Sequence, residues 1–312
     1  MPVLVACSEI GSAVALSKVI ESKNINLFYL LASNVVKKFF LSQNFKYVIL
    51  DYSNDIPDDI DLLLLGSTIG PSLERQFYVS PKYFDTYKIS VIDSYWNIHQ
   101  RFSNEISGTR WEFSPDEIFV PNLEISDALK NSGFLGLIHL FSSPSFNISY
   151  KPADPREVRV TRRKYGIDEG QKVYIFISEY SQKTPNDWKL NIDQYNYNDI
   201  QYSMDLFFRH IDYLNKINNI HIPFIKWHPT NEDKLNLNIP SKHIENQLVS
   251  IPKEELFMLG DIFVGINSML LLEAYNRGFK TISFMSKKMS KKNNLANFIP
   301  EIYVSDNEIF EL

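Results

Sequence analysis

The stretch GDIFVGINSMLLLEAYNRGFKTISF, residues 260–284, reads as an apolar run, a leucine-rich segment and a second apolar run. The apolar runs are rich in Ile, Val and Phe, which strands favour, whereas the leucine-rich segment is predicted to be a helix. An Asn-Ser turn precedes this segment, and Gly278 stands where a helix commonly ends. The order strand, helix, strand predicts two parallel strands joined by a crossover helix.

The same alternation runs through the rest of the 312-residue chain. The predicted strands are residues 3–7, 25–32, 47–51, 61–67, 88–96, 172–178, 222–229, 248–252, 261–268 and 280–285. Helical segments separate most of them, and residues 72–84 and 199–217 are two of the predicted helices. Apolar strands separated by helices indicate parallel sheets covered on both faces, because the connections are too long for hairpin turns.

A change in composition divides the chain near residue 150. Three prolines lie between residues 144 and 155, and a charged helical stretch follows them. Such a change is typical of a domain boundary. We therefore predict an α/β protein of two Rossmann-like domains, residues 1–150 and 151–312, that face each other across a cleft. Residues 294–312 are a candidate for packing back on the first domain.

Composition excludes several classes of function. Hydrophobic residues make up 44% and charged residues 22% of the chain, values typical of a soluble globular protein. The net charge of −5, without a long Lys or Arg run, argues against nucleic acid as a partner. Cys7 is the single cysteine, so no intramolecular disulfide is expected. No apolar stretch reaches the roughly 18 residues of a membrane span, and we predict neither a signal peptide nor a transmembrane helix.

Polar residues follow many of the predicted strands and are expected to face the cleft. In open parallel sheets, ligands bind beyond the carboxyl ends of the strands. Lys226 and His228 lie two apart at a strand end, so their side chains share one face and can bind one anionic group. Pro229 ends the strand and fixes the next turn. A surface lysine followed by a turn histidine is the alternative interpretation.

The Asn267-Ser268 turn predicts a second part of the same site. Ser268 is expected at the N-cap of a helix, beside unpaired backbone N–H groups and the positive end of the helix dipole. Such a position binds phosphate readily. Glu273 is expected to accept hydrogen bonds from ribose hydroxyls, and Ser178 ends another strand that faces the site. Alternatively, Ser268 is only a cap and Glu273 belongs to a solvated face.

The order KWHP, residues 226–229, then GINSMLLLEAYNRGFKTISF, residues 265–284, resembles the nucleotide-binding domain of two-domain GT-B glycosyltransferases. It looks most like the bacterial sialyltransferase and Kdo-transferase type, with its His-Pro motif and later Ser-Ser/Thr motif. The CDP-glycerol glycerophosphotransferases of teichoic acid synthesis have a similar pair. The resemblance implies that His228, Pro229 and Ser268 contact the phosphate and ribose of a donor nucleotide, without a bound metal. The departure is a single serine at the second motif rather than a doubled one.

A second resemblance lies in the first half of the chain. A Gly-Ser-Thr turn, a helix with an early Glu, and a strand followed by Asp, Trp and Arg-Phe resemble a segment of bacterial surface-polysaccharide proteins. The residues concerned are Gly66, Ser67, Thr68, Glu74, Asp93, Trp96, Arg101 and Phe102. Ser94 and Tyr95 are inserted between the Asp and the Trp. This resemblance implies a role in the synthesis of a cell-surface glycan.

An inverting glycosyl transfer needs a carboxylate or a histidine that takes the proton from the acceptor hydroxyl. Asp93 and Glu74 are the leading candidates for this base, followed by Glu9. Asp93 ends an apolar strand, which directs its carboxylate to the cleft. The alternatives are that Asp93 caps a turn, that Glu74 pairs with Arg75 or Arg101, and that Glu9 lies in a solvated loop.

Together these features predict a glycosyltransferase that moves a sugar from a nucleotide-activated donor to a bacterial surface glycan. A CMP-nonulosonic acid or a Kdo-like sugar is the candidate donor, and the acceptor is a glycan or a lipid-linked glycan. The nucleotide sugar is a substrate, and we expect no cofactor and no metal. Three alternatives stay open: a UDP-GlcNAc 2-epimerase-like enzyme, a CDP-glycerol glycerophosphotransferase and a non-catalytic GT-B-like scaffold protein.

The expected location is the cytoplasm, with peripheral association at the inner face of the membrane left open. A short basic cluster bears on that question and consists of Lys287, Lys288, Lys291 and Lys292. These lysines are interpreted as a solvated loop, and contact with a membrane or a phosphate is the alternative. A homodimer is also left open.

Overall fold

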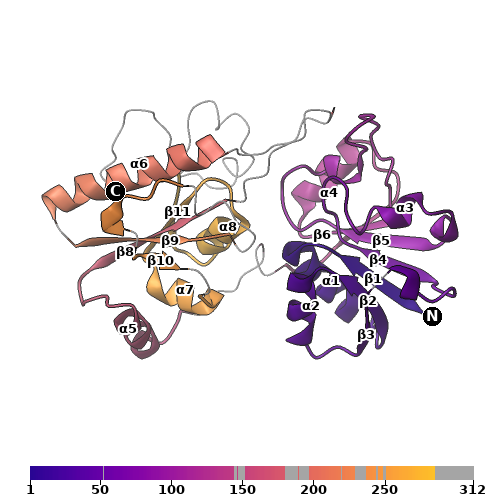
Figure 1. The fold of residues 1–312 in the computed structure, drawn as a ribbon, viewed down its shortest axis with the longest axis horizontal. Helices are drawn as coiled ribbons and strands as arrows, with labels where there is room; N and C mark the ends of the chain where they lie inside the picture. The colour runs from indigo at the N-terminus through magenta and orange to yellow at the C-terminus, as the bar shows by residue number, and fades with distance from the viewer. Residues whose placement is uncertain are drawn as a thin grey trace. The chain divides into compact units, whose positions relative to one another are not determined.

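The computed structural model describes residues 1–51, 53–143, 146, 152–179, 189, 197–218, 220–228, 237–243, 245–248 and 251–284. The chain divides into two compact units, each built on one sheet (Figure 1). The described residues up to Ser143, with Lys189, form the first unit, and the remaining described residues form the second. The predicted boundary at residues 150–151, the lysine cluster at 287–292 and the segment 294–312 lie outside the described residues.

The sheet of the first unit has seven parallel strands in the order β3-β2-β1-β4-β5-β6-β7. The strands are β1 (Val3–Cys7), β2 (Phe28–Ala32), β3 (Tyr47–Leu50), β4 (Leu62–Leu65), β5 (Tyr87–Val91), β6 (Glu117–Val120) and β7 (Leu137–Leu140). The helices are α1 (Ile10–Ser22), α2 (Asn34–Leu41), α3 (Gln76–Val79) and α4 (Leu123–Asn131). The strand order reverses between β1 and β4, which is where open parallel sheets bind ligands.

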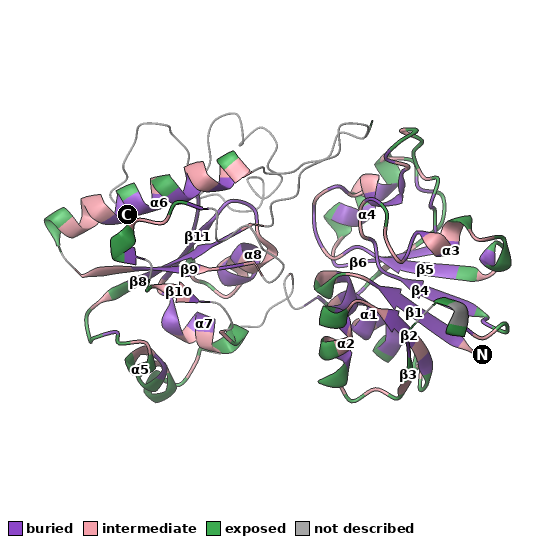
Figure 2. Ribbon diagram, in the orientation of Figure 1, coloured by how far each residue is buried: buried purple, intermediate pink, exposed green. Residues whose placement is uncertain are grey.

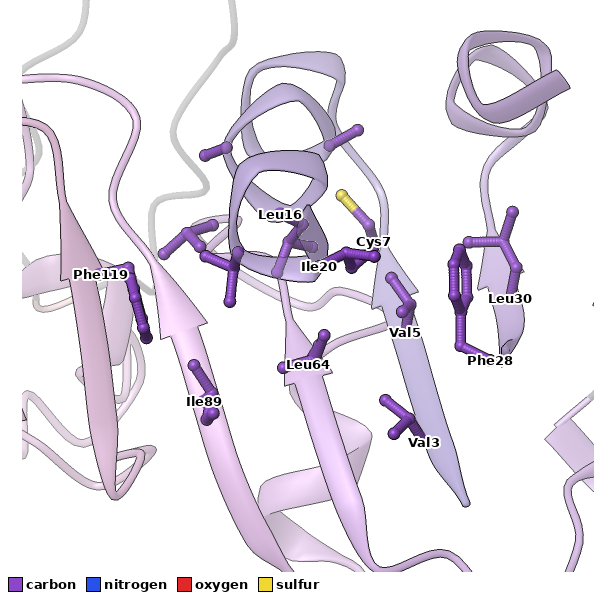
Figure 3. Packing of buried hydrophobic residues seen from close by; sticks show 14 of the residues in the cluster. Val3, Val5, Cys7, Leu16, Ile20, Phe28, Leu30, Leu64, Ile89 and Phe119 are labelled. Carbon is purple, nitrogen blue, oxygen red and sulfur yellow. The ribbon is translucent and has the colours of Figure 1, made fainter. Parts of the chain in front are cut away.

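Strand β1 is buried along its whole length, because apolar side chains cover both faces of the sheet. Its alternate residues belong to two different core clusters, since neighbouring side chains of a strand point to opposite faces. Figure 3 shows Leu16 and Ile20 of α1 on the same face as Val5 and Leu64. A strand buried on both faces favours apolar side chains, and in β1 polar residues begin only after Cys7.

The sheet of the second unit has five parallel strands in the order β10-β9-β8-β11-β12. The strands are β8 (Lys172–Ile177), β9 (His221–Lys226), β10 (Gln247–Leu248), β11 (Ile262–Gly265) and β12 (Lys280–Ser283). The helices are α5 (Pro155–Lys164), α6 (Tyr197–Ile217), α7 (Lys253–Leu259) and α8 (Met269–Asn276). The order reverses again, here between β8 and β11. The predicted fold class, two Rossmann-like α/β units with parallel sheets, is confirmed.

The unit predicted for residues 260–284 is formed by β11, α8 and β12. The two strands pair in parallel, with Ile262 beside Lys280. Gly278 follows α8 with a φ of 82°, a left-handed conformation that glycine adopts at little steric cost. Its N–H donates to the Tyr275 carbonyl at 2.8 Å, which closes the helix and returns the chain to the sheet.

Helix α6 is the longest helix in the described part of the chain, with 21 residues. It buries one apolar stripe that includes Ile200, Met204, Phe207 and Ile211, and the rest of its surface is largely polar. Figure 2 shows the alternation of buried and exposed turns along it. No helix among the described residues is both long enough and apolar enough to cross a membrane.

The prediction of one helix over residues 72–84 is wrong. The structure has only the short helix α3 and then a separate 3-10 turn over Pro81–Tyr83. Pro81 has no N–H to donate within a helix, and its ring disfavours helical geometry at the residue before it. Helix α3 therefore ends at Val79, and Ser80 is extended with a ψ of 122°.

Candidate functional site

Glu74 joins the loops that follow β1 and β4, at the reversal point of the first sheet. The backbone N–H and the hydroxyl of Ser8 donate to its carboxylate at 2.6 and 2.8 Å, and the Thr68 hydroxyl donates to it at 3.3 Å. Glu74 is only 1% exposed. Arg75, its suggested partner, forms an ion pair with Glu105 instead. The geometry gives Glu74 the role of an acceptor that positions two loops.

Asp93, at the end of β5, is bound by Arg101. Arg101 Nη1 donates to Asp93 Oδ1 and to Ser67 Oγ, both at 3.0 Å, and Nη2 donates to the Ser94 hydroxyl. A Cβ atom at Gly11 would lie 1.9 Å from Asp93 Oδ2, so glycine is required where α1 approaches this carboxylate. The ion pair therefore links β5, the loop after β4 and the first turn of α1.

Glu9 stands at the N-cap position of α1, and its side chain accepts no hydrogen bond from that helix. The residue as a whole is exposed, but protein atoms around the carboxyl group remove part of its solvation. This loss, with the negative charges of Asp93 and Glu74, raises the pKa of Glu9 to about 7, although Arg101 opposes the shift. A carboxyl group with such a pKa can both take up and release a proton at neutral pH, as a general base must.

Glu179, after β8, and Asn267, after β11, meet at the reversal point of the second sheet. The Asn267 N–H donates to Glu179 Oε1 at 2.7 Å. Burial raises the pKa of Glu179 to about 7, and hydrogen bonds from the backbone at Asn267, Ile266 and Ser268 oppose the shift. These N–H groups precede α8, where an anion binds most favourably. A carboxyl group of the protein itself occupies this position.

Lys226 ends β9, and His228 follows two residues later. Trp227 between them is 2% exposed, and its Nε1 donates to Gln247 Oε1 at 2.9 Å. Lys226 Nζ donates to the Trp227 carbonyl at 3.1 Å, and burial lowers its pKa. Burial and the charge of Lys226 lower the pKa of His228 to about 4, so the imidazole is neutral at pH 7. Pro229 lies outside the described residues.

Ser268 is the N-cap of α8, as predicted, because its Oγ accepts a hydrogen bond from the Leu270 N–H at 3.2 Å. Glu273, further along α8, is 3% exposed and lies between Lys253 (3.0 Å) and Arg277 (2.9 Å). The alternative that Glu273 belongs to a solvated face is therefore wrong. Its contact with a ribose stays a prediction, and in this structure its carboxylate is held by two cations.

Asn267 and Ser178 are both buried beside Glu179. Asn267 is 6% exposed, and its Oδ1 has no hydrogen-bond partner among the residues that the structure describes. Ser178 is 1% exposed, and its hydroxyl donates to the Glu179 carbonyl at 3.3 Å. The edge of the second sheet thus offers an amide acceptor beside the N-terminus of α8.

The described ranges contain no group of three or more His, Cys, Asp or Glu side chains placed to hold a metal ion. Cys7 ends β1 of the first sheet, and its thiol is fully buried and therefore not accessible as a nucleophile. Burial and the nearby Glu74 carboxylate raise the pKa of Cys7, whereas a nucleophilic cysteine needs a lowered pKa. The chemistry of the described edges therefore rests on carboxylates, Lys226, His228 and backbone N–H groups.

Substitution of Arg101 by Gln should lower the free energy of unfolding by about 3 kcal/mol, because it leaves the Asp93 charge partly buried without its cation. Urea denaturation of the parent and of Arg101→Gln measures this difference. Lys18→Gln removes an exposed ion pair in α1 and is the matched control, with an expected change within about 1 kcal/mol. Equal losses in the two variants would show that the Arg101 ion pair does not hold these loops together.

No protein-family model matches the chain, and no curated protein matches its sequence. Solved structures match its fold. The UDP-GlcNAc 2-epimerase of Methanocaldococcus jannaschii in complex with UDP-GlcNAc and UDP is 10% identical, with a TM-score of 0.60 over 98% of this chain and 89% of that chain. The UDP-GlcNAc 2-epimerase of Neisseria meningitidis bound to UDP-GlcNAc is 11% identical, with a TM-score of 0.57 over 91% and 82%. The wall teichoic acid polymerase TagF is 10% identical, with a TM-score of 0.51 over 90% and 69%.

The matches extend over at least 90% of this chain and therefore include both units. Identities of 10 to 11% make this a similarity of fold. It agrees with the two all-parallel sheets, each of which reverses its strand order once. The chain has the two-domain GT-B-like fold.

Proposed function

We propose that the protein is a glycosyltransferase that moves a sugar from a nucleotide-activated donor to a bacterial surface glycan. The observation that carries the proposal is the composition of one edge of the second sheet. There β9 ends in Lys226 and His228, and β11 leads into the Ser268-capped start of α8. A cation, a neutral imidazole and a helix N-terminus are together suited to the phosphate of a nucleotide. The solved structures with bound UDP-GlcNAc support a ligand of this class.

In the proposed donor site, Lys226 supplies positive charge to the phosphate and His228 donates a hydrogen bond to phosphate or ribose. In this proposal the phosphate replaces the Glu179 carboxyl group as acceptor of the backbone N–H groups at the start of α8, with Ser178 and Asn267 beside it. Glu273 contacts the ribose in this proposal, and Pro229 fixes the turn after His228. A CMP-nonulosonic acid or Kdo-like sugar remains the proposed donor, on the resemblance of the two motifs.

Glu9 is the proposed general base. In the transfer, the acceptor oxygen bonds to the sugar, the bond between sugar and phosphate breaks, and the acceptor proton passes to Glu9. The pKa of Glu9, about 7, suits proton uptake at neutral pH. The carboxylates of the other two candidates are already bound within the protein. Asp93 is held by Arg101, and Glu74 accepts hydrogen bonds from two loops, so both are proposed to position the site.

Nucleotide binding is the first test of this function. Calorimetric titration with CMP, CDP, UDP and UDP-GlcNAc should detect binding of at least one ligand at millimolar concentration or below, and the proposed donor site would be wrong if none of them bound.

A UDP-GlcNAc 2-epimerase is the second candidate function, because two of the similar structures are named as UDP-GlcNAc 2-epimerases. Conversion of UDP-GlcNAc without an acceptor would favour it. Turnover of CDP-glycerol would favour glycerophosphate transfer, the third candidate.

Glu9→Gln should lower the rate of transfer by about a hundredfold or more and leave nucleotide binding unchanged. In the parent the rate should rise with pH and level off above about 7, as Glu9 loses its proton. The matched control is Glu21→Gln, an exposed residue of the same helix. A scaffold role, the remaining alternative, would gain if cellular glycan were unchanged by Glu9→Gln, and retention of full transfer activity would exclude Glu9 as the base.

Lys226→Ala should weaken nucleotide binding ten- to hundredfold, because a charge-assisted hydrogen bond contributes about 1.5–3 kcal/mol. The loss should shrink at high salt. His228→Ala should cost about fivefold and change little between pH 6 and 8, because a neutral imidazole donates in both cases. Lys242→Ala, at an exposed ion pair, is the control. Normal nucleotide binding with a strongly lowered melting temperature would make the motif a structural turn.

Nucleotide binding should also depend on Glu179. Its carboxyl group is largely protonated at pH 6 and charged at pH 8, and the charge opposes a phosphate at the same N–H groups. A nucleotide sugar, whose phosphates do not titrate in this range, should therefore bind about tenfold more weakly at pH 8 than at pH 6. Glu179→Gln should abolish the dependence. Equal pH dependence in parent and variant would place the phosphate elsewhere.

A further inference from the structure

A cavity of the second unit lies at the opposite edge of its sheet from the proposed donor site. It has a volume of about 790 Å³. Helix α5, the loop over residues 167–171 and the first residues of β8, β11 and β12 line it. Figure 2 shows that α5 is mostly exposed. The cavity lies entirely among described residues of one unit, and the proposed donor site uses none of them.

Arg162 fixes α5 over the starts of the strands. Its two terminal nitrogens donate to the Asp261 carboxylate at 3.0 and 3.1 Å, and Nη2 also donates to the Gln171 carbonyl at 2.5 Å. Asp261 Oδ2 accepts a further hydrogen bond from the Val173 N–H at 2.8 Å. Arg162 is therefore paired with Asp261 and is not counted among the cations available to a ligand. Its contacts hold α5 in place as one side of the cavity.

Four other cations line the cavity, and among the described residues none of them has an ion-pair partner. They are Arg159, Arg163, Lys172 and Lys280, all of them exposed. Arg159 and Arg163 are four residues apart on α5 and so share one face of the helix. Lys172 and Lys280 begin β8 and β12, which flank β11, and Lys280 is level with Tyr174, so the backbones of the two lysines lie about 12 Å apart. The cavity lining also contains two exposed carboxylates in the loop, Asp168 and Glu169, so these four cations outnumber them.

Two histidines near Lys172 and Lys280 have lowered pKa values, and burial is the larger cause of each shift. Burial and then the charge of Lys172 lower the pKa of His221, at the start of β9. Burial, His221 and Lys280 lower the pKa of His210 in α6 to about 4.

We propose that this cavity is a binding site for a phosphate-bearing ligand, held by Arg159, Arg163, Lys172 and Lys280. Arginine and lysine are the side chains that bind phosphate oxygens best, and several of them around one cavity suit a diphosphate. Val158, Ile167 and Ile262 add apolar surface for the uncharged part of the ligand. A soluble phosphate ester and an anionic lipid headgroup share this chemistry.

Calorimetric titration with inorganic pyrophosphate tests the soluble source. The parent should bind it, and Arg163→Gln/Lys280→Gln should bind it at least about tenfold more weakly. The control Arg209→Gln/Lys216→Gln removes the same charges from exposed positions of α6 and should bind like the parent. The same double substitution made in a Lys226→Ala background should cause the same loss, which separates this cavity from the proposed donor site. All altered side chains are exposed or partly exposed, and thermal melting verifies that each variant is folded.

Sedimentation with vesicles tests the lipid source. If a lipid headgroup is the ligand, the parent should sediment with vesicles of equal parts phosphatidylglycerol and phosphatidylcholine, and Arg163→Gln/Lys280→Gln should stay in the supernatant. Vesicles of pure phosphatidylcholine are the control. Weaker binding of pyrophosphate or of vesicles by the double variant, with unchanged binding by the control variant, supports the site and identifies the ligand as a soluble phosphate or a lipid headgroup. The proposal is overturned if the parent binds neither probe, or if the double variant and the control behave alike in both arms.

Discussion

Parallel pairing of strands that are buried on both faces is the constraint on which the rest of the structure depends. Strands β1, β4 and β11 are buried at every residue, and β8 at all but its first. Such strands carry few polar side chains along their length, and the buried Lys88 of β5 and Glu117 of β6 are hydrogen-bonded within the protein. Since all strands of a sheet run in one direction, the first polar residues after them gather at one edge. The carboxylates of the first unit and the Lys226 edge of the second unit follow from this rule.

The same constraint made β1, β4, β8 and β11 predictable from the sequence. Strands β6 and β7 were not predicted, although β6 is also buried at all four residues. A strand covered on both faces is a continuous apolar run, which is a strong signal. Strand β7 lies at the edge of its sheet, and its Leu137 and Leu140 are 58% and 54% exposed. Both β6 and β7 have only four residues, one of which is polar (Glu117 and His139), so neither is a continuous apolar run. The prediction of one helix over residues 72–84 was wrong because Pro81 interrupts it.

The site was predictable in position but not in its pairings. The ends of the predicted strands identified Asp93, Ser178, Lys226 and Ser268 from the sequence alone. The partners of such residues come from distant parts of the chain: Glu74 meets Ser8 across 66 positions, and Glu179 meets Asn267 across 88. These contacts determine which carboxylates accept hydrogen bonds from distant loops, and burial raises the pKa of Glu9 and of Glu179 to about 7. No spacing rule reveals them, because tertiary packing sets them.

The two edges of the second sheet differ in how they can attract an anion. Where strands end, a helix often begins, and its N-terminal N–H groups and dipole supply positive potential without any charged side chain. Helix α8 does so after β11. At the other edge strands begin after helices end, and the helix dipole there is negative. An anion at that edge has to be bound by side-chain cations, and α5 with the first residues of β8 and β12 brings four of them to one cavity.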